Sequence, residues 1–200
     1  MARRRVPLGA RPELAGPAQA EVLRSAVAGE PWAHAALYDA LYPIVARALH
    51  KILRENTDYE DLVQTSFELI VRTLQKPTAH EIQNLASLSS AIAARVALDS
   101  LRSRIRERKI FDRDEEAARA AENVPGMRLE RQLDLRRDLV WLQRTLAGMN
   151  PKQAETVLLH DVLGHDMWEV AELTSASHAT AQKRLSRGHL LLKNRAKRRQ

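Results

Sequence analysis

The stretch over residues 157–193 constrains most strongly what this chain can fold into. A short helix with an apolar face is expected first, followed by residues 174–177, Thr-Ser-Ala-Ser, which have no helical period. Ser177 is a residue type that caps helices, so a second helix should begin at His178. This second helix carries apolar residues at helical spacing, Ala181, Leu185 and Leu192. The order of elements predicts a helix-turn-helix, whose second helix enters the major groove of DNA.

The charge of the C-terminal segment supports binding to a polyanion. No acidic residue follows Glu172, whereas eight basic residues do: Lys183, Arg184, Arg187, Lys193, Arg195, Lys197, Arg198 and Arg199. The whole chain has a net charge of +7 and a pI of about 10.1, which favours nucleic acid over a membrane surface as partner. Taken alone, the segment leaves open a less favoured alternative, a solvated amphipathic helix with a basic tail.

Aliphatic residues at helical spacing predict an all-α protein. Hydrophobic residues make up 44% of the chain but aromatic residues only 4%, which favours helices over a β-sandwich. We expect helices over residues 18–28, 32–53, 59–74, 85–108, 134–148 and 152–163. The absence of cysteine excludes disulfides and thiolate metal sites and is compatible with a cytoplasmic location.

A change in character over residues 109–134 divides the chain into two small helical domains. Charges alternate there, apolar spacing lapses, and Val124-Pro125-Gly126 breaks any helix, so we expect a flexible linker. The predicted order is a disordered basic arm (1–17), a first domain (18–108), the linker (109–134), a helix-turn-helix domain (135–196) and a basic tail (197–200). No apolar run approaches the ~20 residues that span a bilayer, so no membrane insertion is expected.

The helix over residues 59–74 carries an unexpected acidic face. Five acidic residues and no basic residue lie in 55–68 of an otherwise basic chain. Acids in the first turn complement the helix dipole, but this does not explain Glu68. The face opposite the apolar stripe consists of Asp61, Gln64, Thr65, Glu68 and Arg72. A negative face on a DNA-binding chain indicates a protein partner.

A second polar line lies on the helix over residues 85–108. Arg95, Asp99, Arg102 and Arg106 follow one another at three- and four-residue spacing. This line is either a solvated face or a second surface for nucleic acid.

No motif for catalysis or metal binding is present. The pairs His160-Asp161 and His165-Asp166 flank Gly164 without further ligands at suitable spacing, and there is no phosphate-binding glycine loop or nucleophile motif. We therefore expect no enzyme activity, no cofactor and no metal site.

The informative stretches together resemble one protein family. Residues 58–64 with Phe67 resemble the D-x-E-D-L-V-Q-x-x-F helix of bacterial sigma factors of the sigma-70 family, extracytoplasmic-function type. Ile92-Ala93-Ala94-Arg95, with Asp99 and Arg102, is similar to the helix that follows in that family. Residues 150–193 resemble its second domain at Glu169-Val170-Ala171 and at Ser177, Thr180, Arg184, Leu185 and Arg187.

The resemblance implies a dissociable subunit of bacterial RNA polymerase that directs promoter-specific initiation. The first domain would dock on a coiled coil of the largest polymerase subunit through Asp61, Leu62, Gln64 and Glu68. The same domain would open the −10 element and hold it with the loop over residues 76–84 and the next helix, where the candidate residues are Asn84, Arg95, Asp99, Arg102 and Arg106. An anti-sigma factor is a further partner that the resemblance leaves open.

The second domain would read the −35 element. Ser177 can cap the recognition helix and touch a phosphate. Near the start of that helix, where base edges are within reach, lie His178, Ala179, Thr180, Gln182 and Lys183. Arg184 and Arg187 would neutralise phosphates, so affinity should fall with salt.

The chain departs from the family pattern at four places, one of which is the loop over residues 76–84, which lacks aromatic residues that could stack on unpaired bases. Leu88-Ser89 stands where the family usually has Trp-Leu, Ser175 where the turn usually has Gly, and Gln182 where Lys is common. These changes concern the promoter side and leave the polymerase-binding motif intact. Two alternatives remain: a helix-turn-helix regulator that acts without polymerase, and a sigma-like adaptor that binds a protein partner.

Overall fold

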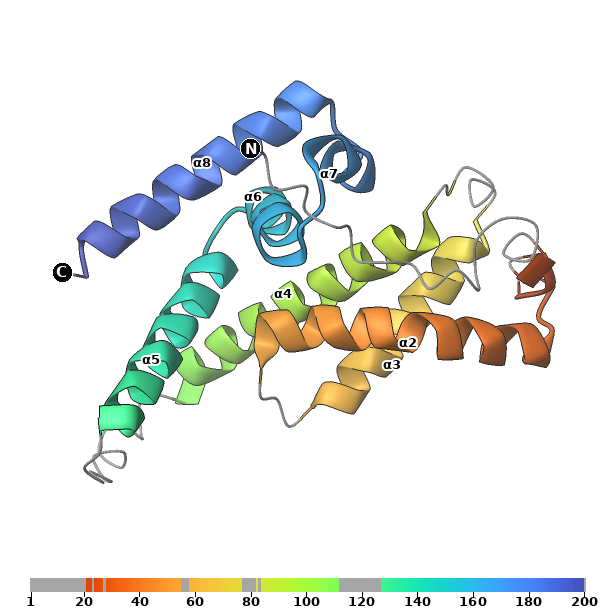
Figure 1. Ribbon diagram of the computed structural model, residues 1–200, viewed down its shortest axis with the longest axis horizontal. Coiled ribbons are helices and arrows are strands. Elements are labelled where there is room, and N and C mark those ends of the chain that lie inside the picture. Colours follow the sequence, from red (N-terminus) through yellow and green to blue (C-terminus); the bar gives the residue numbers. More distant parts are fainter. Residues whose placement is uncertain are drawn as a thin grey trace.

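The computed structural model describes residues 21–22, 24–26, 28–54, 58–76, 82, 84–111 and 127–199, and within these ranges the chain is all-α, as predicted. Figure 1 shows the elements in order. They are α2 (Pro31–Leu53), α3 (Tyr59–Leu74), α4 (Leu85–Phe111), α5 (Met127–Ala147), α6 (Pro151–Val157), the π-helix η3 (Leu158–Leu163), α7 (Met167–Leu173) and α8 (His178–Lys197). The predicted arm and most of the predicted loop over 76–84 lie outside the described residues.

The first domain is built from α2, α3 and α4, which pack against one another. Their apolar stripes supply its core, because residues at three- and four-residue spacing share one face of a helix. The side chains that this domain buries almost completely include Leu41, Val45, Leu49, Val63 and Ile70. The packing leaves the acidic face of α3 on the outside of the molecule.

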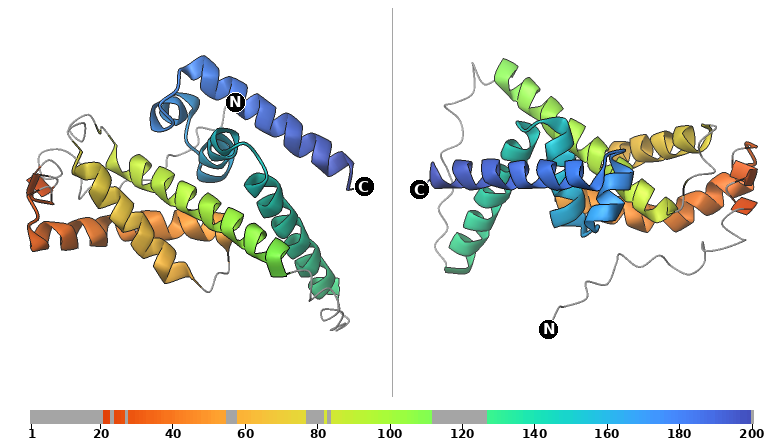
Figure 2. Two further views of the ribbon diagram at one scale, coloured as in Figure 1. Left: turned by 180° about the vertical axis from the view of Figure 1, so that it is seen from behind. Right: turned by 90° about the horizontal axis from the view of Figure 1, so that it is seen from above.

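The second domain consists of α6, η3, α7 and α8, with α8 crossing α6 (Figure 2). The segment expected as a single helix over 152–163 is an α-helix that continues as the π-helix η3 and ends at Gly164, where φ is +87°. At the crossing, Gly188 brings the backbone of α8 against the side chain of Val157. Asp166 caps α7 and Ser177 caps α8, so the predicted turn and both of its flanking helices form.

Helices extend into both ends of the segment that was predicted as a linker. Helix α4 extends to Phe111 and α5 begins at Met127, seven residues before the expected start. The segment Met-Arg-Leu-Glu-Arg-Gln-Leu-Asp is rich in strong helix formers, and this propensity outweighs the poor apolar spacing on which the prediction relied. Residues 112–126 lie outside the described part of the chain.

The two domains lie against each other along α4. This helix contacts α2 and α3 on one side and α5, α6, η3 and α7 on the other (Figure 1). The buried apolar residues of the two domains form one continuous cluster. None of the helices within the described ranges has the length and apolar character that a membrane span requires.

The turn of the helix-turn-helix contains a strained residue. Ser175 has φ +46°, a left-handed conformation that a side chain disfavours and glycine adopts freely. We expect Ser175→Gly to raise the free energy of unfolding by about 0.5–1 kcal/mol in a urea titration. The matched control is Ser186→Gly on the exposed side of α8. This substitution should lower the free energy of unfolding by about 0.5 kcal/mol, because glycine is a poor helix former. Equal effects at both positions would show that Ser175 is unstrained.

Candidate functional site

The acidic face of α3 borders a groove between α3 and α2. Asp61, Gln64 and Glu68 are exposed, as predicted, whereas Leu62 is half-buried and packs against the core. The residues that line the groove are Tyr38, Glu60, Asp61, Val63, Gln64, Phe67, Glu68, Val71 and Arg72. Its apolar part includes the rings of Tyr38 and Phe67, whose centroids are 4.5 Å apart. An apolar floor with an acidic rim suits a basic amphipathic helix.

The polar side chains of this face are only weakly engaged. Gln64 Nε2 donates a hydrogen bond to Glu68 Oε1 over 3.3 Å, and Arg72 lies 4.0 Å from the other oxygen of the same carboxylate. Such exposed contacts contribute little to stability, so a partner can replace them at small cost. No signal in the sequence singled out Tyr38, which comes from α2 and joins this face only in the fold.

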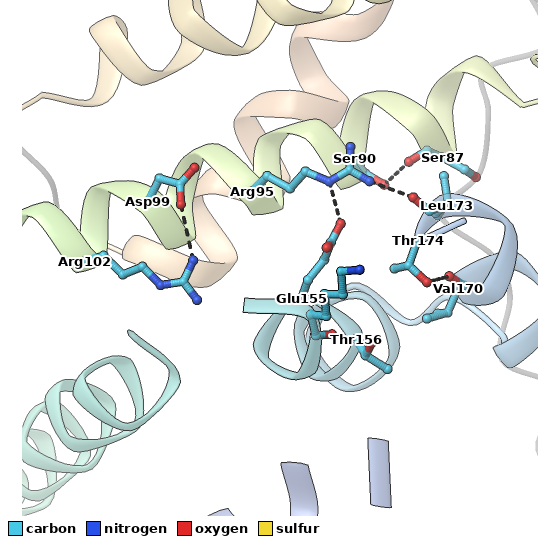
Figure 3. Close-up of polar contacts among 11 residues, drawn as sticks. Ser87, Ser90, Arg95, Asp99, Arg102, Glu155, Thr156, Val170, Leu173 and Thr174 are labelled. Carbon is cyan, nitrogen blue, oxygen red and sulfur yellow. Dashed lines mark hydrogen bonds and ion pairs between the residues drawn. The ribbon is translucent and has the colours of Figure 1, made fainter. Parts of the chain in front are cut away.

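Two of the predicted −10 residues are engaged by elements later in the chain, α5, α6 and α7. Arg95 forms an ion pair with Glu155 of α6, and its Nη2 donates to the carbonyl oxygen of Leu173 over 2.6 Å (Figure 3). Arg102 donates from Nε to the carbonyl oxygen of Ala147 over 3.3 Å, at the end of α5. Arg95 and Arg102 on the polar side of α4 therefore contact other parts of the chain, although 42% of the Arg95 side chain stays exposed.

The other three predicted −10 residues are exposed. Asn84 caps α4, because its Oδ1 accepts a hydrogen bond from Ser87 N over 3.0 Å. Asp99 lies 3.3 Å from the guanidinium of Arg102, and Arg106 extends the same line of side chains. The structure thus brings Arg95, Asp99 and Arg102 to one side of α4, as the spacing predicted, while Asn84 lies at its start.

A buried polar network also joins the domains. His165 Nδ1 lies 2.8 Å from Glu169 Oε2, and His165 Nε2 lies 2.8 Å from Ser90 Oγ. Ser87 Oγ donates to the other oxygen of Glu169. The hydrogen bond with His165 lowers the pKa of Glu169 below its usual value, against the opposing effect of burial. Sequence reasoning missed this network, although three serines in the apolar stretch from Leu85 to Ala94 were a signal for it.

Helix α8 carries the predicted −35 residues in its first half and at its cap. Ser177 Oγ accepts a hydrogen bond from Thr180 N over 3.2 Å and so caps the helix. The exposed members of the set are Ser177, Ala179, Thr180, Gln182, Lys183 and Arg187. Arg184 is half-buried, and its Nη1 is enclosed without a hydrogen-bond partner, which places this atom away from an outer phosphate surface.

His178 is held by an aromatic residue that sequence reasoning missed. Its ring stacks on Trp168 of α7 with centroids 4.1 Å apart and an interplanar angle of 25°. Trp168 nevertheless leaves 73% of its surface exposed. The stack fixes the orientation of His178 at the start of α8, beside the residues that would approach base edges.

The histidine-aspartate pairs of the sequence have structural roles. Asp161 Oδ1 lies 2.8 Å from His160 Nδ1, and its Oδ2 lies 2.6 Å from His189 Nε2, which joins η3 to α8. Burial raises the pKa of Asp161, but hydrogen bonds from the two histidines outweigh it, so the net shift is downward. Among the described residues, no group of three or more histidine or acidic side chains is arranged to hold a metal ion.

Comparisons with known proteins agree with the geometry of the second domain. Residues 139–191 match the family model of sigma-70, region 4, which confirms the resemblance to the sigma-70 family in this segment. A solved structure of CnrH in complex with the cytosolic domain of CnrY is 19% identical, with a TM-score of 0.47, and the match covers 88% of this chain and 96% of that one. No curated protein sequence matches the chain.

Proposed function

We propose that this protein is a sigma factor of the extracytoplasmic-function type, which binds core RNA polymerase and directs it to promoters by contacts with −10 and −35 elements. The observation that carries the proposal is the region 4 match over residues 139–191, which falls on the helix-turn-helix. The acidic groove on α3 supports it, since a DNA-binding domain alone has no use for that surface. Such a factor works where its polymerase does, in the cytoplasm.

The polymerase contact is proposed for the groove beside α3. Asp61, Gln64 and Glu68 stand on its rim, and Leu62 supports the helix from the core side. A coiled-coil helix of the polymerase with basic side chains could place them against this rim and apolar side chains against Phe67. Exposed carboxylates would speed the encounter and fix the register, while the apolar contact would supply most of the affinity.

The DNA contacts are proposed for α8 and α4. On α8, side chains from Ser177 to Lys183 would meet base edges and phosphates of the −35 element, with Arg187 further along the helix. On α4, Arg95, Asp99, Arg102 and Arg106 would meet the −10 element, with Asn84 at the start of the helix. Because Arg184 Nη1 is enclosed, we assign Arg184 mainly to positioning α8 within the second domain.

Arg187 gives the proposal a quantitative test. Its side chain is exposed and carries a full charge, so Arg187→Ala should weaken binding to −35 duplex DNA across sequences. The slope of log affinity against log salt concentration should flatten by about one unit, because one phosphate contact is lost. Fluorescence anisotropy over a salt series measures this slope. An unchanged slope would show that Arg187 contacts no phosphate.

Co-elution with core polymerase separates the proposed function from its alternatives. A sigma factor should co-elute with core enzyme in gel filtration, and the complex should retain promoter DNA. A helix-turn-helix regulator would bind duplex DNA and ignore the polymerase. A sigma-like adaptor would bind a protein partner, such as an anti-sigma factor, and no DNA.

A further inference from the structure

Trp168 is the most exposed large hydrophobic side chain in the part of the chain that the structure describes, with 73% of its surface accessible. We propose that Trp168 contacts promoter DNA together with His178. Its indole N–H donates to a phosphate of the −35 element, and its ring holds the His178 imidazole against the edge of one base pair. This inference rests on the proposed function, because it takes α8 to be the helix that enters the major groove.

Two helix caps fix the backbone under the two rings. Asp166 Oδ1 accepts hydrogen bonds from the backbone N–H groups of Trp168 and Glu169, each over 2.9 Å, so Trp168 belongs to the capped first turn of α7. Ser177 caps α8, whose first residue is His178. The stacked rings, with centroids 4.1 Å apart, are therefore arranged before DNA binds, which lowers the entropic cost of ordering them in a complex.

The polar atoms of both rings are available to a ligand. Neither Trp168 Nε1 nor either nitrogen of the His178 ring has a hydrogen-bond partner among the described residues. An indole N–H only donates and a phosphate oxygen accepts, so these two groups match. A neutral imidazole both donates and accepts, as base edges in the major groove do. The stacked pair thus offers a group suited to the DNA backbone beside a group suited to a base edge.

The place of α7 in the fold gives the two rings different targets. Helix α7 packs against α8, and Figure 1 shows it beside the first turns of that helix. In a helix-turn-helix the second helix reaches base edges with its N-terminal residues, while the first helix crosses the phosphate backbone. His178 begins the second helix and Trp168 lies in the first turn of the first helix. The imidazole therefore belongs at a base and the indole N–H at the backbone.

Three substitutions separate the parts of this pair. Trp168→Ala removes both the stack and the indole N–H, whereas Trp168→Phe keeps an aromatic ring against His178 and removes only the N–H. His178→Ala removes the base contact. The matched control is Trp32→Ala, because Trp32 is also an exposed tryptophan and the second residue of its helix, but lies at the start of α2 in the first domain. Substitutions at exposed positions should leave the fold intact, and urea unfolding of each variant checks this.

The readout is DNA binding by holoenzyme that is reconstituted from core polymerase and each variant. The DNA is a promoter that the wild-type holoenzyme transcribes, with its −35 region randomised. Sequencing of the bound duplexes gives the preference at each base pair, and titration of one duplex gives the affinity. We expect wild-type protein to show about a tenfold preference at the base pair that His178 contacts. Trp32→Ala should behave like wild type.

The variants at the stacked pair should differ in a defined way. Trp168→Ala and His178→Ala should both reduce the preference to about twofold at the same base pair and leave the other pairs unchanged. Trp168→Phe should keep the preference, because the ring still holds His178. It should nevertheless weaken the affinity for every sequence by roughly fivefold, because one hydrogen bond to a phosphate is lost.

Two results would overturn the proposal. If Trp168→Ala keeps the preference that His178→Ala loses, the stack does not position the imidazole. If Trp168→Phe binds as tightly as wild type, no phosphate meets the indole N–H. The proposed function fails differently: wild-type protein that forms no holoenzyme, or a holoenzyme without any preference in the −35 region, removes the sigma assignment and the stacked pair with it. A preference that all variants share keeps the sigma assignment and overturns only the DNA contact of Trp168 and His178.

Discussion

Replacing Asp61 and Gln64 together by alanine is expected to weaken binding to core polymerase roughly 30-fold, while the helical content and the free energy of unfolding stay close to wild type. Both side chains are exposed on the rim of the α3 groove. When the polymerase covers them, each side chain should contribute on the order of 1 kcal/mol to binding. The loss of about 2 kcal/mol for the pair corresponds to a roughly 30-fold weaker affinity. Surface substitutions of this type usually change stability by less than about 0.5 kcal/mol. Surface plasmon resonance against core enzyme measures the affinity, and circular dichroism measures the helicity.

The matched control is Gln75→Ala, an exposed glutamine at the end of α3 that does not line the groove. Its affinity for core polymerase should stay within about twofold of wild type. If the double variant also binds like wild type, the α3 groove is not the polymerase contact. A large loss of helicity in the double variant would instead refute the surface assignment of the two residues.

Gly188→Ala should lower the free energy of unfolding by about 1–3 kcal/mol, although alanine is the better helix former. A Cβ atom at this position would lie 2.6 Å from Val157 Cγ2 and 3.3 Å from the methyl group of Met149. Val157 cannot yield easily, because its branched side chain is stiff and is buried at the crossing of α6 and α8, whereas the methyl group of Met149 can move. The midpoint temperature of thermal unfolding should therefore fall by roughly 2–4 °C for each kcal/mol of unfolding free energy that is lost.

A double-mutant cycle tests the cause of this effect. Val157→Ala removes the methyl group that the new Cβ would meet. In the Val157→Ala protein, the loss in free energy of unfolding caused by Gly188→Ala should therefore be smaller by at least about 1 kcal/mol. Urea unfolding of the four proteins gives the coupling energy. Additive effects would show that the destabilisation does not arise from the close approach of α8 to α6.

Local patterns were sufficient to predict the helices and the chemistry of their exposed faces. The predicted limits of α3, Tyr59 and Leu74, agree with the structure, and its apolar spacing predicted the acidic outer face. The Thr-Ser-Ala-Ser segment predicted the turn before α8, and Ser177 is its cap. These features depend on residues a few positions apart, because helix capping and the sharing of one helix face both act between such close neighbours.

Contacts between distant elements could not be read in this way. The pairing of Arg95 with Glu155 and of Ser90 with His165 joins residues 60 and 75 positions apart. Polar spacing on α4 indicated a nucleic-acid surface, but an arginine line binds carboxylates and carbonyl oxygens as readily as phosphates. The start of α5 at Met127 was missed because helix propensity, rather than apolar spacing, determines it.

Run-off transcription tests the central claim most directly. Purified bacterial core polymerase would be combined with this protein on a library of promoter-like DNA, with Asp61→Ala/Gln64→Ala protein as the matched control. The account predicts transcripts that start at a defined site, depend on the wild-type protein and fall sharply with the variant. Binding of the protein to duplex DNA without any association with core polymerase or any defined transcript would contradict it.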